Sequence, residues 1–167
     1  MIDHDVLRID RLVNDISTAS KLDSDFLKDQ ESKFELVADL FEKSIKVVGL
    51  EDRLAQVIMN LITNAISFCG AGDAIRIWVR QCDNRVLIVV EDTGPGLSDG
   101  SLQKIFDRFY SDRPASDFGN HSGLGLAISK QIVDAHCGLI WAENVRAPDA
   151  EDSAPSDGAR FVVGLPV

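Results

Sequence analysis

Apolar residues recur along this chain with two different periods, and these periods predict its helices and strands. Apolar side chains at every third or fourth position predict amphipathic helices over 52–68 and 124–135. Residues 75–80 alternate between apolar and polar, as in a half-buried strand, whereas 86–90 are all apolar, as in a central strand covered on both faces. Shorter apolar runs predict three more strands, at 45–48, 139–143 and 160–165. The polar residues 148–158 predict a hairpin connection. The sum is an α/β fold, a two-layer sandwich in which a mixed sheet carries helices on one face.

The first part of the chain predicts one long, coiled-coil-like helix ahead of this sandwich. Apolar residues repeat at heptad spacing over 2–22, with charged residues elsewhere. The members of this seam are Ile2, Ile9, Leu12, Ile16 and Ala19. A helix that pairs with a second copy fits the seam, and we favour it over the alternative, an amphipathic helix packed against its own domain. Residues 34–41 predict a second, shorter helix.

Composition narrows the class of protein. The chain has 167 residues, 45% of them hydrophobic, and a formal charge of −10. Such acidity argues against non-specific binding to nucleic acid or to membrane surfaces, which needs clustered cations. Three cysteines without metal-ligand spacing indicate a reducing compartment. The absence of a long apolar run or a signal peptide leads us to expect a cytoplasmic protein segment.

A carboxylate and a glycine turn follow the all-apolar strand directly. Asp92 precedes Thr93-Gly94-Pro95-Gly96. A carboxylate in this place can accept a hydrogen bond from an exocyclic amino group, while the glycines allow a flat ring to approach the backbone. This arrangement favours adenine over guanine. Taken alone, the same residues could form no more than a tight turn.

Two asparagines interrupt the apolar side of the predicted helix at 52–68. Asn60 and Asn64 are four residues apart and share one helix face, and Gln56 extends this face by a turn. Inward amides cost free energy unless a polar group meets them, and amide oxygens suit Mg²⁺ that also bridges phosphates. The alternative is a pair of surface amides, which mid-helix placement among Leu and Ile disfavours.

A second glycine turn opens the helix at 124–135. Gly123-Leu124-Gly125-Leu126 would leave backbone N–H groups free to hold phosphate at the helix N-terminus. The polar stretch 111–122 is long for a connector, and we interpret it as a lid over a nucleotide. Aromatic residues Phe106, Phe109 and Tyr110 would anchor its first end, and Arg108 and Arg113 are the candidate phosphate contacts, although both could be surface charges.

Four segments, taken in this order, resemble the N, G1, F and G2 boxes of sensor histidine kinases, within the GHKL superfamily that includes DNA gyrase. They are 56–65, 91–97, 105–110 and 122–127. The resemblance covers 34–167 and implies the Bergerat ATP-binding fold. Residues 1–23 resemble part of the second helix of the dimerisation and histidine-phosphotransfer hairpin. Details at 112–114 and 140–144 are most similar to the ChvG/ExoS-type kinases of alphaproteobacteria.

The resemblance implies roles for individual residues. Asn60 and Asn64 would be catalytic, with Asn60 as the Mg²⁺ ligand, and Asp92 would recognise adenine. The other implied ATP-binding residues are Gly94, Gly96, Phe109, Arg113, Gly123, Leu124, Gly125 and Leu126. Hydrolases of the superfamily have a general-base glutamate where this chain has Asn60. An amide cannot deprotonate water, so the site should keep the γ-phosphoryl group of ATP for an imidazole.

The chain departs from the family pattern at three places. The phosphoacceptor histidine is missing, because His4 lacks the surrounding family residues and we interpret His121 and His136 as structural or surface groups. Ser67 stands where many relatives have a cationic residue that reaches phosphate. Ser44 runs directly into the strand at 45–48, where relatives insert a strand and loop, so we predict that residues are absent between Ser44 and Ile45.

These observations predict the catalytic and ATP-binding domain (34–167) of a two-component sensor histidine kinase. With ATP and Mg²⁺ it would phosphorylate a histidine supplied in trans by a dimerisation hairpin, for relay to a response-regulator receiver domain. The full kinase would be a membrane-anchored homodimer, and this segment its cytoplasmic part. The alternatives are an ATPase or anti-sigma-type serine kinase on the same fold, and a non-catalytic nucleotide-binding module.

Overall fold

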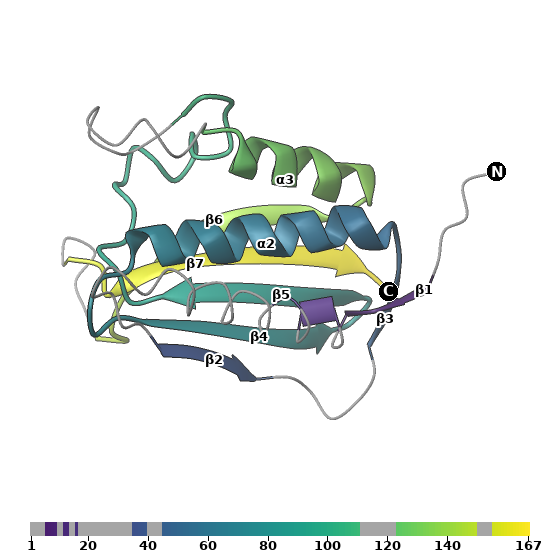
Figure 1. Cartoon of the computed structure of the whole chain (residues 1–167), viewed down its shortest axis with the longest axis horizontal. Helices are drawn as coiled ribbons and strands as arrows, with labels where there is room; N and C mark the ends of the chain where they lie inside the picture. Colours follow the sequence, from purple (N-terminus) through teal and green to yellow (C-terminus); the bar gives the residue numbers. More distant parts are fainter. Residues whose placement is uncertain are drawn as a thin grey trace, which may run out of the picture.

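The fold is seen in a computed structural model of the chain (Figure 1). It describes residues 6–9, 12–13, 16, 35–39, 45–110, 123–149 and 155–167. Within these ranges no helix is long and apolar enough to cross a membrane.

Four antiparallel strands form the centre of the molecule, in the order β4-β5-β7-β6. They are β4 (Ala74–Cys82), β5 (Arg85–Asp92), β6 (Leu139–Val145) and β7 (Gly158–Pro166). A fifth strand, β2 (Glu35–Asp39), pairs in parallel with β4 at the edge, so the sheet is mixed as predicted. The all-apolar run in β5 lies between β4 and β7, which explains why both of its faces are covered.

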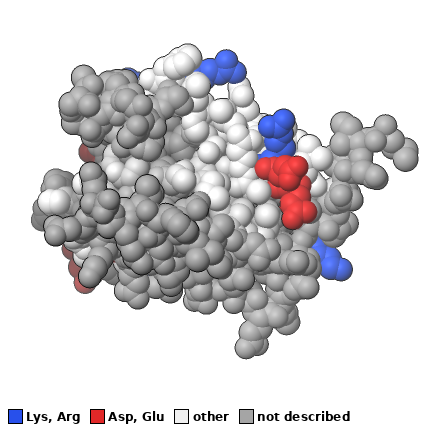
Figure 2. Space-filling model, viewed as in Figure 1, with Lys and Arg blue, Asp and Glu red and all other residues white. Residues whose placement is uncertain are grey.

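Two helices pack against each other and against this sheet (Figure 1). They are α2 (Glu51–Phe68) and α3 (Gly125–Ala135), at the positions that the apolar periods predict. The core between helices and sheet contains the apolar face of α2 and every second residue of the central strands. Its fully buried members include Leu54, Ile58, Leu61, Ile62, Ile75, Ile77, Ile88 and Phe161. On the face shown in Figure 2, an uncharged area has charged side chains along its upper and right margins, where a basic and an acidic group touch.

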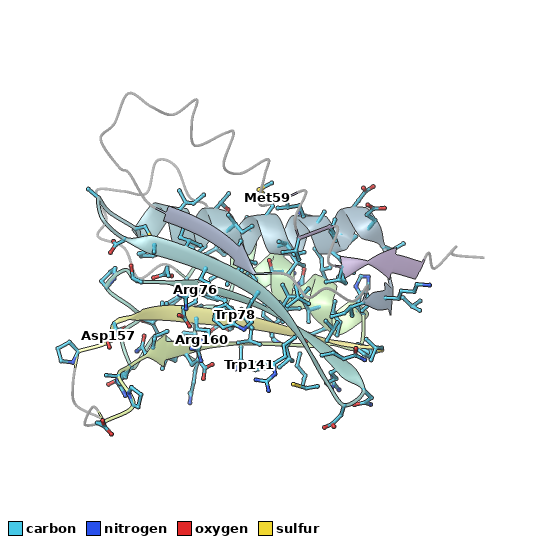
Figure 3. All side chains as sticks on the ribbon, turned by 90° about the horizontal axis from the view of Figure 1, so that it is seen from below. Met59, Arg76, Trp78, Trp141, Asp157 and Arg160 are labelled. Carbon is cyan, nitrogen blue, oxygen red and sulfur yellow. The ribbon has the colours of Figure 1, made fainter. Side chains whose placement is uncertain are left out.

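The opposite face of the sheet carries alternating residues of the same strands. Trp78, Val89, Val162 and Trp141 are cross-strand neighbours in one row. In the next row Arg160 forms an ion pair with Glu91 at 2.6 Å, and its guanidinium lies 5.6 Å from the centre of the Trp78 ring (Figure 3). This face is held by side-chain pairs within the sheet itself.

The predicted helix at 34–41 is wrong, because Glu35–Asp39 form strand β2. In the pairing Leu36 lies opposite Ile75 and Ala38 opposite Ile77. Apolar periodicity over so few residues does not separate a helix from a strand. The backbone groups at the free edge of β4 decide the outcome, since a strand satisfies them and a helix does not.

The N-terminal segment also differs from the expected continuous helix. Val6–Arg8 form strand β1, which pairs antiparallel with β3 (Lys46–Val48). Residues 9, 12, 13 and 16 are helical, and Ile9, Leu12 and Ile16 of the predicted seam are buried in the domain's own core. This packing is the one expected from the alternative, an amphipathic helix on its own domain. Ile2 and Ala19 lie outside the described residues, and the division into 1–23 and 34–167 stays a prediction.

Candidate functional site

The residues predicted to bind nucleotide lie where three elements meet. Asp92 ends β5, Asn60 lies in the middle of α2, and Gly125 begins α3. The two helices contact each other, and α2 also contacts β5. Segments that are far apart in the sequence are therefore brought to one side of the sheet.

Asp92 is a buried carboxylate with one oxygen held by the backbone. Only 3% of the residue is exposed. Its Oδ1 accepts hydrogen bonds from the backbone N–H groups of Gly94 at 3.0 Å and Ala159 at 3.3 Å. Burial raises the pKa of Asp92, and these two hydrogen bonds oppose part of the rise. Among the described residues Oδ2 has no hydrogen-bond partner, so it can accept one from a ligand.

The glycines beside Asp92 leave no room for side chains. A Cβ at Gly94 would lie 3.0 Å from Asp92 Oδ1 and 3.2 Å from the carbonyl oxygen of Phe68. Gly96 has φ +75°, which disfavours other residues, and a Cβ there would overlap Ser156. The turn that encloses the Asp92 carboxylate thus favours glycine at Gly96 through its backbone conformation and leaves only tight space for a side chain at Gly94.

A small polar network fixes the turn from the other side. Thr93 Oγ1 donates to Asp73 Oδ1 at 3.2 Å and accepts from the N–H of Ala74 at 2.9 Å. The second oxygen of Asp73 accepts from the N–H of Gly70 at 2.7 Å. Nearby, burial together with Asp92 and Asp73 raises the pKa of Cys69 to about 12, so its thiol stays protonated. The sequence analysis missed Asp73, although an aspartate in a glycine turn is a known signal for such bonds.

Asn60 is held by the first turn of α3. Its Nδ2 donates to the carbonyl oxygen of Gly125 at 3.0 Å and to Ser129 Oγ at 3.1 Å, and Ser129 in turn donates to the same carbonyl at 2.9 Å. Because a carbonyl oxygen can only accept, the amide nitrogen must face Gly125. Oδ1 has no hydrogen-bond partner in the part of the chain that the structure describes, so it can contact a ligand. Ser129 is fully buried and was missed by the sequence analysis, since a serine on an apolar helix face gives little signal.

Asn64 lies one turn further along α2 and is half-buried. Its carbonyl oxygen accepts from Ser67 Oγ at 2.6 Å, which shows that Ser67 binds its own helix. The side-chain amide of Asn64 forms no hydrogen bond with any described residue. Helix α2 contacts the start of α3 through Asn60 and lies against Gly94 through Phe68. These two positions are eight residues, or about 12 Å, apart along the helix. Asn64 thus lies between the two glycine turns.

The residues that flank the predicted lid on its two sides are joined by a backbone hydrogen bond. The N–H of Phe109 donates to the carbonyl oxygen of Gly123 at 3.2 Å. Gly123 has φ +65°, and a Cβ there would come within 3.0 Å of the Tyr110 carbonyl. Phe109 is 74% exposed, so its ring is available to a ligand. The lid itself, residues 111–122 with Arg113, lies outside the described residues.

The start of α3 provides hydrogen-bond donors rather than a charge. Leu124 is the N-cap residue, and Gly125 and Leu126 form the first turn. The N–H groups of a helix's first turn have no partner within the helix, and its dipole favours an anion there. Arg108 is exposed. Across the described ranges, no cluster of three His, Cys, Asp or Glu side chains could hold a metal ion. A metal here would depend on amide and phosphate oxygens.

His136 has a structural place, as the sequence analysis expected. Its Nε2 accepts from the N–H of Leu50 at 3.1 Å, and its Nδ1 lies 2.7 Å from the carbonyl oxygen of Ile132. The Nε2 bond joins the end of α3 to the start of α2, while the Nδ1 contact stays within the last turn of α3.

The fold, the buried carboxylate and the two glycine turns define a nucleotide-binding domain. Residues 49–167 match the family of histidine kinase-, DNA gyrase B- and HSP90-like ATPases, and the chain belongs to this family.

The chain is similar along nearly its whole length to sensor kinases. It is 41% identical to the sensor protein ChvG of Rhizobium meliloti and 39% identical to that of Agrobacterium fabrum, over 99% of this chain in both comparisons. It spans only 33% and 32% of those proteins. The sensor protein kinase WalK of Staphylococcus aureus is 35% identical over 83% of this chain and 39% of the relative. The chain is thus the catalytic, ATP-binding domain of a two-component sensor histidine kinase.

Solved structures agree on the fold. The catalytic domain of histidine kinase ThkA superposes with a TM-score of 0.79 at 22% identity, covering 99% of this chain and 96% of that one. The mycobacterial sensor histidine kinase MprB gives 0.77 at 24% identity, with 98% and 97% covered. The ChvG alignment spans 197 positions, so the relative has at least 197 − 167 = 30 residues without a counterpart here. The alignment length does not say where in the chain these residues fall. The absence of residues between Ser44 and Ile45 therefore stays a prediction.

Proposed function

We propose that this domain transfers the γ-phosphoryl group of ATP to a nitrogen of a histidine side chain supplied by a separate dimerisation hairpin. ADP leaves, and the phosphohistidine then passes the group to an aspartate of a response regulator. One relative of this fold, ThkA, has been solved in complex with the response regulator protein TrrA, which supports a partner of this kind.

The observation that carries the proposal is the fixed amide of Asn60. Its Nδ2 is committed to Gly125 and Ser129, so Oδ1 is the atom left for the ligand. An amide oxygen has no basicity to activate water, but it suits Mg²⁺. The ion, when bound, would neutralise charge on the phosphates. Asn60 would hold it in place, and the start of α3 would offer N–H groups to the phosphate oxygens.

The remaining residues have proposed roles along the nucleotide. Asp92 Oδ2 accepts a hydrogen bond from the adenine amino group, in the turn shaped by Gly94 and Gly96. Asn64 contacts the phosphates between the two ends, and Phe109 covers the nucleotide. Phosphate contacts come from Arg113, Gly123, Leu124, Gly125 and Leu126.

The experiment has two parts. Calorimetry with ATP, with and without Mg²⁺, measures binding, which we expect to be tighter with the ion. The domain is then incubated with γ-labelled ATP and a separately purified histidine-bearing hairpin, and the acid-labile label on the hairpin is measured beside free phosphate. Transfer to the hairpin with little free phosphate supports the proposal. Rapid release of phosphate would instead indicate an ATPase, and binding without either product would indicate a non-catalytic module.

A further inference from the structure

The glycine turn after Asp92 is held by a hairpin that the predicted ATP site does not include. This hairpin joins β6 to β7, and its backbone closes where the N–H of Asp157 donates to the carbonyl oxygen of Val145 at 2.7 Å. Asp157 lies at one end of the sheet (Figure 3). Two side chains of the hairpin, Asn144 and Ser156, bond to the backbone of the turn. We call this pair the hairpin clamp.

Asn144 uses both ends of its amide on one residue of the turn. Its Oδ1 accepts from the N–H of Leu97 at 2.7 Å, and its Nδ2 donates to the carbonyl oxygen of Leu97 at 2.7 Å. The side chain thus pairs with both the backbone N–H and the backbone carbonyl of Leu97, as a residue of a neighbouring β-strand would. An aspartate cannot do so, because a carboxylate would face the Leu97 carbonyl oxygen without a proton between them.

Ser156 holds the turn one step earlier, where its Oγ donates to the carbonyl oxygen of Pro95 at 2.9 Å. Gly96 lies between the two bonded positions, and a Cβ there would overlap Ser156 and approach Asn144 Oδ1 to 2.9 Å. The clamp is therefore packed directly against the turn, with no space for a larger residue between them.

The same hairpin also reaches the carboxylate. Asn144 is paired in register with Ala159 of β7, and the N–H of Ala159 donates to Asp92 Oδ1. Gly158 has φ +148°, and a Cβ there would overlap the Asp92 carbonyl. Residues at the joined ends of β6 and β7 thus contact both walls of the pocket proposed for adenine, the Asp92 carboxylate and the Gly94–Leu97 backbone.

We infer that Asn144, assisted by Ser156, is a positioning residue that sets the shape of the base pocket and thereby the preference of this site for adenine. The inference rests on the proposed function. A base is recognised through a hydrogen bond and the close approach of a flat ring, and both depend on where the turn lies relative to Asp92. The proposed triphosphate contacts come from α2 and α3, to which neither Asn144 nor Ser156 forms a hydrogen bond among the described residues. Loss of the clamp should therefore change base binding and leave triphosphate binding in place.

The test compares Asn144→Asp with Asn84→Asp, a matched control that adds the same charge in the exposed β4–β5 turn. Calorimetry measures the Kd of Mg²⁺-ATP, Mg²⁺-GTP and Mg²⁺-tripolyphosphate for each protein. We expect Asn144→Asp to weaken ATP binding about tenfold, as the loss of one to two part-buried hydrogen bonds implies. The Kd for tripolyphosphate should stay unchanged, and the preference in affinity for ATP over GTP should fall. In the phosphotransfer assay KM for ATP should rise while kcat at saturation stays close to wild type. Asn84→Asp should match wild type throughout.

Ser156→Ala provides a milder variant should Asn144→Asp fail to fold, with an expected loss of about threefold in ATP affinity and the same pattern across ligands. An unchanged ATP/GTP ratio in the folded variants, or a parallel loss of ATP and tripolyphosphate, would overturn the inference. If the wild-type protein binds ATP and the Asp92→Asn variant does not, the proposed ATP site still holds and only the inference about the clamp is overturned. Wild-type protein that binds no ATP would overturn both.

Discussion

The two ends of the proposed nucleotide site are built in different ways. The base end consists of Asp92 and the turn 93–97, whose backbone is hydrogen-bonded to β4 at Thr93 and to the hairpin clamp at Pro95 and Leu97. The phosphate end consists of Asn60, Asn64 and the start of α3 from Gly123. There, only Asn60 is fixed by described residues, through Gly125 and Ser129, and Phe109 is largely exposed.

This difference indicates which part is ready before the ligand arrives. Sheet hydrogen bonds and buried side chains hold the base end in one geometry, so little ordering is needed for adenine to bind. The phosphate end depends on how α3 is placed, and the Phe109–Gly123 backbone contact lies just before that helix. Changes at the base end should therefore act mainly on affinity, and changes at the phosphate end mainly on transfer.

The largest effect is expected from Asn60→Asp. The new carboxylate would face the Gly125 carbonyl, which now accepts a hydrogen bond from Nδ2, and it would repel the triphosphate. Removal of one well-placed electrostatic contact costs about 100-fold or more in rate, so transfer to the hairpin should fall by at least that factor. Thr63→Ala on the exposed face of α2 is the control. If the Asn60→Asp variant still transferred phosphate at the wild-type rate, changes at the phosphate end would not act mainly on transfer.

Asp92→Asn tests the base end. The amide oxygen can still accept from Gly94 and Ala159, so the domain should fold, but the charged acceptor for the adenine amino group is lost. A hydrogen bond to a charged group contributes about 1.5–3 kcal/mol, which corresponds to roughly 10- to 100-fold in the Kd for ATP. Calorimetry measures it. An unchanged Kd would contradict the role given to Asp92.

Ser129→Ala refines the comparison at the phosphate end. The substitution removes one of the two acceptors of Asn60 Nδ2 and leaves the other. We expect a loss of about fivefold in the rate of transfer, in line with one neutral hydrogen bond. The Kd for ADP should change little, because the base end is untouched. A larger effect on ADP binding than on transfer would show that the two ends are not separable.

The pKa of Asp92 provides a test of burial at the base end. Burial raises this pKa above its usual value of 3.8, so the folded protein holds the proton to a higher pH than the unfolded chain. The free energy of unfolding contributed by Asp92 is therefore greatest at low pH and declines as pH rises from about 4 through the folded pKa. Asp92→Asn lacks this decline. Urea unfolding from pH 4 to pH 7 should show the variant gaining stability relative to wild type as pH rises.

The smallest effect is expected on the face of the sheet away from the helices. Arg160→Gln removes the ion pair with Glu91 and the contact with the Trp78 ring, and should lower the free energy of unfolding by about 1 kcal/mol. ATP binding and transfer should remain as in wild type. A change in the Kd for ATP would mean that the base end also depends on side chains on the face of the sheet away from the helices.

Local patterns in the sequence predicted much of the fold and part of the site. The helices α2 and α3 and the hairpin from β4 to β5 follow from apolar periods within single segments. The short motifs around Asn60, Asp92 and Gly123 indicated a nucleotide site because each requires residue types at fixed spacing. The same patterns failed at Glu35–Asp39, where a short apolar run fits a helix and a strand equally well.

By itself, therefore, the sequence determined the helices α2 and α3, the strands β3 to β7, and the presence of the family's ATP-binding motifs in order. Only the tertiary structure decided how they are held. Asn144 meets Leu97 across 47 residues, Asn60 meets Gly125 across 65, and Ala159 meets Asp92 across 67. No local period encodes such contacts, because they exist only once the sheet order β4-β5-β7-β6 and the packing of α2 on α3 bring these segments together. The same packing buried Ile9, Leu12 and Ile16 of the predicted seam within the domain itself.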